Sequence, residues 1–391
     1  MEKSMRKRLT ILLLLLACAL AVLPASGFEF VFGDLDQHGE ILGGFLPSYL
    51  KAGAGYNGFS LIEDRTTQID LLVGGGYSQR KVWQNPVTGA VEDSDPVIYD
   101  TVRIDWEVRF SQGLWASPVE GKDLLTLSAG YTGRYDMNID SFKTGSVRAN
   151  GGPFPIRTLD ESIGPDYMGS VYPDLRGDRQ HLGTAFTLTA RVDLMDDQKM
   201  YANGFYTTVE FLWAPGVLNS ALDGEADYYS ADFNAVGAWT PVSFTEEGGI
   251  HLFSLTLIDR LNANWTDGSE VPVYAQSSVS LGRKVRGFTT WTYNTQFTMV
   301  NNFDIRFAGP AWHSIFPRIN LFFDVGYGCG DYFNTDTGGS NFLMSTGIQM
   351  TVSFFDFIDL GYQIAYLFDG YNFVDGPDES ITGKFTFFLD F

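Results

Sequence analysis

An arginine and two aspartates in the last third of the chain have the residue types and the order that a buried ion-pair cluster requires. Arg286 lies in a short glycine-containing segment, and Asp304 and Asp324 lie in the next two apolar-rich segments. A guanidinium group and carboxylates form strong, directional hydrogen bonds. A buried ion pair is evidence that the chain adopts one specific conformation, and it is weaker evidence that the pair adds stability. We therefore expect this cluster to pin a loop rather than to catalyse a reaction.

The two aspartates are expected to point to the same side of neighbouring β-strands. Phe303, Ile305 and Phe307 share one face of the first expected strand. Asp304 lies on the opposite face because side chains alternate along a strand, and the residues around Asp324 alternate in the same way. If the apolar faces meet lipid, both carboxylates point into the lumen of a barrel. The alternative is that Arg286 is an ordinary charged residue in an exposed loop.

The same alternation recurs along the chain in segments of about ten residues separated by turn residues, which is the pattern of a transmembrane β-barrel. Twelve segments are predicted as strands: 68–83, 102–115, 124–135, 181–194, 202–214, 231–244, 250–265, 294–308, 316–328, 341–355, 357–368 and 380–391. Residues 28–61 leave room for about two more. The sequence predicts an all-β fold, a transmembrane antiparallel β-barrel of about 14 strands, with 12 to 16 open.

The connections between these strands are alternately short and long. The short ones are 117–122, 196–201, 246–249 and 309–315; the long ones are 84–101, 136–180, 216–230, 266–293, 331–340 and 369–379. In outer-membrane barrels the short turns face the periplasm and the long loops face outward. This asymmetry places Arg286 in an extracellular loop, which must fold inward to reach the aspartates.

The first 27 residues are predicted to be a secretory signal peptide. Four basic residues precede an apolar run at 9–16, and small residues at 25–27 offer a cleavage site. A lipoprotein box ending at Cys18 is an alternative, although the residues after it stay apolar. No other segment contains 18 consecutive apolar residues, so we expect no transmembrane helix. Residues 28–391 then form one outer-membrane β-barrel domain.

The charge of the chain excludes nucleic acid as a natural partner. Removing the four basic residues and one acidic residue of the signal peptide leaves 22 basic and 46 acidic residues, a net charge of −24. Polyanions would be repelled by such a surface. Solvated loops and a polar lumen account for the acidity, and divalent-cation or lipopolysaccharide bridging at the loops is the alternative.

The last strand carries a candidate signal for membrane insertion. Phe387, Leu389 and Phe391 share one face, and the chain ends on an aromatic residue. This arrangement resembles the signal that outer-membrane barrels present to the barrel-assembly machinery. Thr386 stands where that signal usually has glycine, so the match is partial.

The remaining residues offer no catalytic or metal-binding set. The four histidines are scattered through different segments without metal-ligand spacing. His313 has no carboxylate in its turn to orient it, which leaves a hydrolase triad unsupported. We therefore expect no enzyme activity, no metal and no cofactor.

Three motifs together resemble the outer-membrane protein-assembly and two-partner-secretion transporter superfamily, also called the bacterial surface antigen barrels. The motifs are the loop tip Val285, Arg286, Gly287 and Phe288, then the strand with Asp304, then the strand with Asp324. In that family the sixth extracellular loop folds into the lumen and its arginine meets acidic residues of the next two strands. Asp304 stands where the family usually has glutamate. The resemblance covers residues 180–391 well.

The resemblance implies a role in inserting or translocating proteins or lipids at the outer membrane of a diderm bacterium. Its implied partners are outer-membrane lipid, a lipopolysaccharide-like glycolipid, client proteins and the assembly machinery. Family members normally carry periplasmic POTRA domains that capture clients, and about 40 residues before the first confident strand are too few for one. The chain therefore resembles a POTRA-less member, with a possible separate periplasmic partner.

Three other functions remain open from the sequence. A passive pore or a hydrophobic-solute channel would be porin-like and would conduct independently of Arg286. A surface structural or adhesive protein would act through the long loop 136–180. A barrel enzyme is the third, although no catalytic set supports it.

Overall fold

The computed structural model describes residues 27–36, 49–82, 97–142, 146–149, 152–163, 170, 172–177, 179–197, 200–222, 224–246, 251–276, 284–288, 296–311, 315–330, 342–354, 358–368 and 380–389 of the 391-residue chain. Residues 1–26 of the predicted signal peptide lie outside these ranges, as does Phe391 of the predicted insertion signal.

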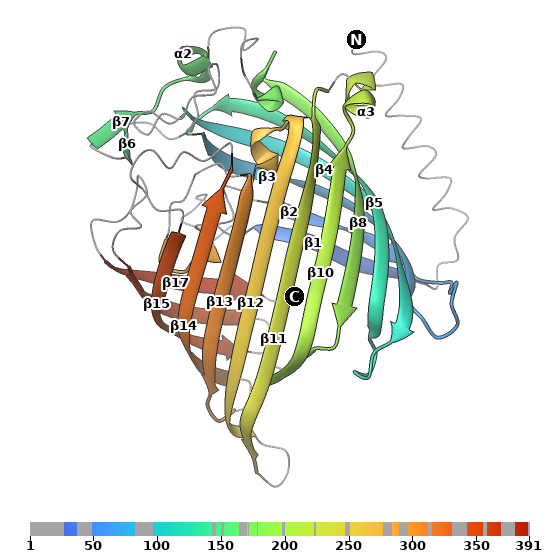
Figure 1. Ribbon diagram of the computed structural model, residues 1–391, viewed down its shortest axis with the longest axis vertical. Coiled ribbons are helices and arrows are strands. Elements are labelled where there is room, and N and C mark those ends of the chain that lie inside the picture. Colours follow the sequence, from blue (N-terminus) through green and yellow to red (C-terminus); the bar gives the residue numbers. More distant parts are fainter. Residues whose placement is uncertain are drawn as a thin grey trace.

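Fourteen antiparallel strands form one sheet that curls into a barrel (Figure 1). In sheet order they are β1 (Phe28–Asp36), β2 (Tyr49–Tyr56), β3 (Thr67–Val82), β4 (Val97–Ala116), β5 (Asp123–Asp140), β8 (Gln180–Asp193), β10 (Ala202–Ala214), β11 (Asp227–Thr245), β12 (His251–Glu270), β13 (Phe297–Ala308), β14 (Ile315–Cys329), β15 (Phe342–Phe354), β16 (Ile358–Leu367) and β17 (Ile381–Leu389). The two-residue β9 (Asp196–Asp197) pairs with β10. The predicted fold and the predicted count of 14 strands are confirmed.

The two faces of the barrel wall differ as the alternation predicted. On β14, Ile319, Leu321 and Phe323 are exposed on the outside, whereas Phe322 and Asp324 point inward and are buried. The same contrast recurs on the other long strands. Among the described residues, no helix is long and apolar enough to cross a membrane.

Four strands extend beyond their predicted bounds, toward the end of the barrel that carries the long connections, here called the loop end. β4, β5, β11 and β12 contain 20, 18, 19 and 20 residues. The predicted loops next to these strands were therefore too long. The reason is visible at the start of β4, where residues 97–101 are all buried. Because both faces are covered there, the two-residue alternation that marked the rest of the strand is lost.

Short helices cover the loop end and bury these extensions. α2 (Leu159–Ile163) begins with a capping box, in which Thr158 Oγ1 accepts from the Glu161 backbone N–H and the Glu161 carboxylate accepts from the Thr158 N–H. α2, η2 (Pro173–Leu175) and η3 (Val273–Ala275) together are here called the cap. Apolar residues of the cap and of β4, together with Tyr172 just before η2, form one buried cluster: Val97, Tyr99, Leu159, Ile163, Tyr172, Leu175 and Val273. The small sheet of β6 (Ser146–Ala149) and β7 (Gly152–Pro155) and the helix α3 (Gly216–Ala221) also lie at this end (Figure 1).

A buried carboxyl group links η2 to η3. Asp174 Oδ1 accepts a hydrogen bond of 2.9 Å from the Val273 backbone N–H, and the Asn138 amide donates to the Asp174 carbonyl oxygen. Burial raises the pKa of Asp174 to about 6; the Val273 hydrogen bond opposes this shift and Asp136 adds to it. The folded cap therefore binds the Asp174 proton more tightly than the unfolded segment does.

Protonation of Asp174 is expected to stabilise the cap. This contribution is complete below the unfolded-state pKa of about 4, is lost as pH rises to about 6, and amounts to roughly 3 kcal/mol. His181, whose ring contacts Tyr274 of η3, acts in the opposite sense, because burial lowers its pKa to about 4. Between pH 7.5 and pH 5, hydrogen exchange of the η2 and η3 amides, corrected for its intrinsic pH dependence, should therefore slow more in the wild type than in Asp174→Asn, which keeps the acceptor for Val273. An equal response of the two proteins to pH would contradict the assignment.

The sheet has two edges, β1 and β17. Within the described residues these strands do not pair with each other, and each pairs only with its neighbour, β2 or β16. The two edge strands β1 and β17 together are here called the seam. Residues 387 and 389 of the predicted insertion signal lie in β17, opposite Leu360 and Ile358 of β16.

Candidate functional site

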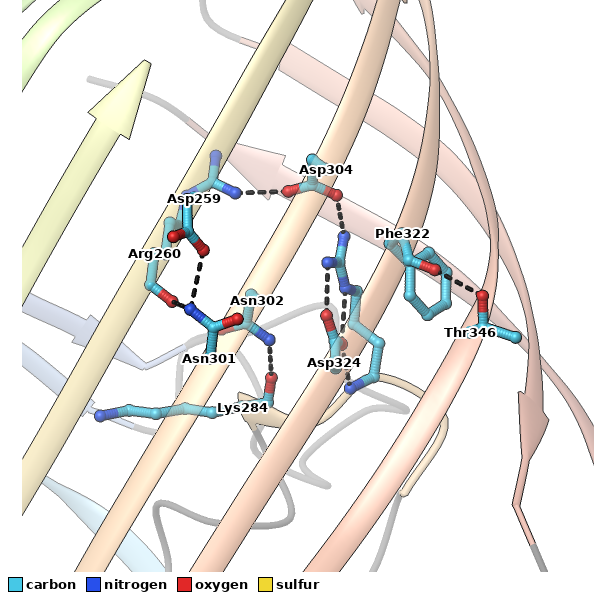
Figure 2. Close-up of polar contacts among 10 residues, drawn as sticks. Asp259, Arg260, Lys284, Asn301, Asn302, Asp304, Phe322, Asp324 and Thr346 are labelled. Atoms are coloured by element: carbon cyan, nitrogen blue, oxygen red, sulfur yellow. Dashed lines mark hydrogen bonds and ion pairs between the residues drawn. The ribbon is translucent and has the colours of Figure 1, made fainter.

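The segment 284–288 lies inside the barrel, against the lumen wall. Val285 and Phe288 are buried, and the Phe288 N–H lies 3.4 Å from the Val285 carbonyl oxygen, which closes a tight turn. One end of this tip is held by β13, where the Asn302 amide donates to the Lys284 carbonyl oxygen at 2.7 Å (Figure 2). The predicted inward fold of this loop is therefore present in its described part.

Arg286 binds Asp324 through three hydrogen bonds. Its Nη2 donates to Oδ1 at 2.6 Å, and its Nε and its backbone N–H both donate to Oδ2 at 2.8 Å. Asp324 has 0% exposure, so this two-pronged pairing is withdrawn from water. Such a geometry fixes the position and the orientation of the tip together.

Asp304 lies between two arginines. It accepts from Arg286 Nη1 at 2.6 Å through one oxygen and from Arg260 Nη1 of β12 at 2.5 Å through the other. Figure 2 shows Arg260, Asp304 and Asp324 on three neighbouring strands, facing the same side of the sheet. Asp304 is 1% exposed. The cluster thus contains two cations and two carboxylates, and its formal charges balance.

An aromatic ring completes the site. The guanidinium carbon of Arg286 lies 4.1 Å from the centre of the Phe322 ring, within the range of a cation–π contact. Phe322 is two residues before Asp324 on β14 and shares its inward face. The Phe322 carbonyl oxygen accepts from the Thr346 hydroxyl of β15 at 2.7 Å. The site therefore spans β12 to β15.

Gly287 brings the tip to the last two strands. Its φ is +98°, a conformation that favours glycine. A β-carbon at this position would lie 2.7 Å from Ala365 Cβ and 2.7 Å from Leu367 Cδ2 on β16. The Thr382 hydroxyl of β17 donates to the Gly287 carbonyl oxygen at 3.2 Å. One loop therefore contacts both the carboxylates of the wall and a strand of the seam.

Gly287→Ala is expected to loosen the tip while leaving the strands intact. The substitution adds a backbone strain of about 1–2 kcal/mol and the clash with β16. We expect faster protease cleavage within residues 277–295. We also expect the unfolding temperature to fall, but by less than it falls in Arg286→Ala. Gly121→Ala is a matched control, because Gly121 has a positive φ and open space around its α-carbon. Equal effects of both variants would mean that strain alone, and not the contact with β16, is responsible.

The structure brings the predicted tip and the two predicted carboxylates together: Val285, Arg286, Gly287, Phe288, Asp304 and Asp324. Arg260, Phe322 and Thr382 were missed. The alternation along their strands marks Arg260 and Phe322 only as residues of the inward face; it does not identify them as partners of Asp304 and Arg286, because that depends on the registers of β12 with β13 and of β13 with β14. No sequence signal marked Thr382.

No protein-family model matches the chain, and no curated protein matches it. Among solved structures, the chain is similar to the crystal structure of BamA from Haemophilus ducreyi lacking POTRA domains 1–3. The two share 12% identity with a TM-score of 0.45, over 92% of this chain and 70% of that chain.

Proposed function

We propose that this chain inserts or translocates proteins or lipids at the outer membrane, through a lumen gated by the loop that carries Arg286. The observation that supports the proposal is the double attachment of the tip. Arg286 binds Asp304 and Asp324, while Gly287 packs on β16 and accepts a hydrogen bond from β17. A movement of the loop would therefore change both the lumen and the support of the seam.

The wall itself suits such a role. Its outer face is apolar and its lumen is lined by ion pairs, for example Arg109 with Asp70 and Arg318 with Asp359. The two edge strands have 9 residues each and do not pair with each other in the described part of the sheet. An unpaired strand edge is a template for the pairing of another chain. A client strand or a lipid could enter the sheet at this point.

A reconstitution experiment tests the proposal. The purified chain in lipid vesicles is mixed with a small outer-membrane barrel protein unfolded in urea, and client folding is followed by its heat-dependent mobility on a gel. Vesicles with the wild-type chain should accelerate folding over empty vesicles, or accelerate the exchange of a fluorescent lipid between leaflets. If neither process is accelerated, the proposal is wrong.

The matched variants are Arg286→Ala and Arg318→Ala. Both remove a lumen-facing arginine with a carboxylate 2.6 Å away, but only Arg286 belongs to the loop. We expect Arg286→Ala to lose most of the acceleration and Arg318→Ala to keep it. Equal activity of the two variants would show that the docked loop does not control the process.

A further inference from the structure

A cavity of about 370 Å³ lies in the lumen directly beneath the cap. Its wall is formed by residues of β2, β4, β5, β8, β10, β11 and β12, and its roof is formed by Tyr274 and Ala275 of η3 and by Gln276, which follows it. The volume lies at the lower end of the range for small-molecule sites, which is about 300–1,000 Å³. The Arg286 cluster is not part of its lining.

The charges around the cavity balance. Lys51 pairs with Glu107 at 2.6 Å, Arg103 lies 3.7 Å from Asp105, and Arg134 pairs with Asp136 at 2.7 Å. A fourth carboxylate, Asp232, interacts electrostatically with the Lys284 ammonium. Among the described residues, the lining cations Lys51, Arg103 and Arg134 and the lining carboxylates Asp105 and Asp232 are thus balanced by Glu107, Asp136 and Lys284, which lie just outside the lining. A ligand with a net charge would find no surplus of the opposite sign here, which favours a neutral occupant.

Three buried polar atoms beside the cavity make no hydrogen bond. Gln276 is 4% exposed, yet its side-chain Oε1 and Nε2 are both buried without a hydrogen bond. The Nε of Arg103 is also buried without a hydrogen bond; it lies 3.7 Å from Asp105 Oδ2, and the guanidinium carbon lies 3.5 Å from the centre of the Tyr49 ring. Buried polar groups are normally satisfied, so these three atoms point to a ligand or to ordered water.

The unpartnered atoms include both donors and an acceptor. Arg103 Nε and Gln276 Nε2 can only donate, and Gln276 Oε1 can only accept. Asp232, whose Oδ1 accepts from the Asn264 amide at 2.6 Å, lines the opposite wall and adds acceptor capacity. Hydroxyl groups both donate and accept, so one hydroxyl-rich molecule could satisfy all of these atoms.

The cavity also has apolar and aromatic surface. Leu212 and Ala185 lie on the wall, and Tyr228 and Tyr274 contact each other edge to face with ring centres 6.5 Å apart. Saccharides present C–H faces between their hydroxyl groups, and these faces match such a surface. A purely polar occupant such as water would leave it uncovered.

We propose that this cavity is a binding site for a neutral, hydroxyl-rich molecule of the size of a mono- or disaccharide. Arg103 and Gln276 hydrogen-bond its hydroxyl groups, and Asp232 accepts from it on the far wall. Tyr274 of η3 and Leu212 of β10 contact its apolar faces. The site is separate from the Arg286 cluster and does not depend on the transport role proposed above.

Isothermal titration calorimetry tests the site with the full chain in an amine-oxide detergent, because glycoside detergents would compete. The probes are glucose and maltose, with acetate and inorganic phosphate as anions and choline as a cation. We expect one-site binding of a saccharide and none of the ions. Binding of an ion in place of the saccharides, or no binding of any probe, would overturn the proposal.

Three variants localise the binding. Gln276→Leu and Arg103→Met should each weaken saccharide affinity roughly tenfold or more, as expected when a buried hydroxyl loses its partner. Gln363→Leu is the matched control, because Gln363 is buried on β16 outside the cavity lining, and it should bind like wild type. Heat resistance on gels verifies that each barrel is folded. Unchanged affinity in folded Gln276→Leu and Arg103→Met would place the saccharide elsewhere and refute this site.

Discussion

Arg286→Ala is expected to destabilise the folded barrel by about 3–5 kcal/mol, the cost of removing one partner from a buried ion pair. Asp304 would keep Arg260, but Asp324 would be left as a buried carboxylate without a cation. The variant should unfold at a lower temperature when samples are heated stepwise and run on a semi-native gel. An unfolding temperature equal to that of the wild type would mean that the tip adds nothing to the barrel.

Asp324→Asn should cost nearly as much, and the double variant should lose little more than Arg286→Ala alone. The reason is that Asp324→Asn also removes the unpaired charge that Arg286→Ala leaves behind. The control is a second double-mutant cycle, which combines Arg318→Ala with Asp324→Asn. These two positions are six residues apart on β14, about 20 Å, and should be additive. Full additivity in the Arg286 cycle would count against the pairing.

The second large effect is expected in single-channel recordings. The wild-type chain in a planar bilayer should pass a small, flickering current, because the docked loop occupies part of the lumen. Arg286→Ala should enlarge this current several-fold as the tip leaves Asp304 and Asp324. Barrels of about 16–18 strands leave an aqueous channel, whereas side chains fill one of about 8 strands, so a barrel of this strand number has a lumen to open.

Arg109→Ala is the control for the recordings. Arg109 is also paired with a lumen carboxylate, Asp70, but on the opposite part of the wall and away from the loop. It should leave the current small. A large, steady wild-type current that neither variant changes would identify an ordinary pore and would remove the basis for a gated lumen.

The parts of the fold that could be predicted from sequence are those governed by the two-residue period. Asp304 and Asp324 are predicted to point inward because Phe303 and Phe323 lie on the opposite, apolar face of their strands, and in the structure both aspartates are buried while both phenylalanines are exposed. The predicted strand ends were wrong where the two faces of a strand no longer differ in burial. At the loop end of β4, the cap covers Val97 and Tyr99 on one face and other groups cover the other, so no alternation could mark the strand.

The contacts of the tip beyond its carboxylates could not be predicted, because they depend on how far the sheet curls. Arg260 reaches Asp304 from a strand whose register with β13 is known only from the structure. Gly287 meets Ala365 and Thr382 across a sequence separation of about 80–95 residues. Whether a loop tip lies near the first or the last strand depends on the curvature of the whole sheet, and no local sequence pattern encodes it.

Within the described residues, the strands of this barrel differ greatly in length. β1, β2, β16 and β17 have 8–10 residues there, whereas β4, β5, β11 and β12 have 18–20. A tilted strand needs about 9–11 residues to cross a bilayer. In a membrane, the described wall would therefore be tall at β4, β5, β11 and β12 and only about long enough to cross at the two edges of the sheet. Lipids next to a short apolar wall thin to match it. The bilayer around this molecule would be thinnest beside its edge strands β1 and β17.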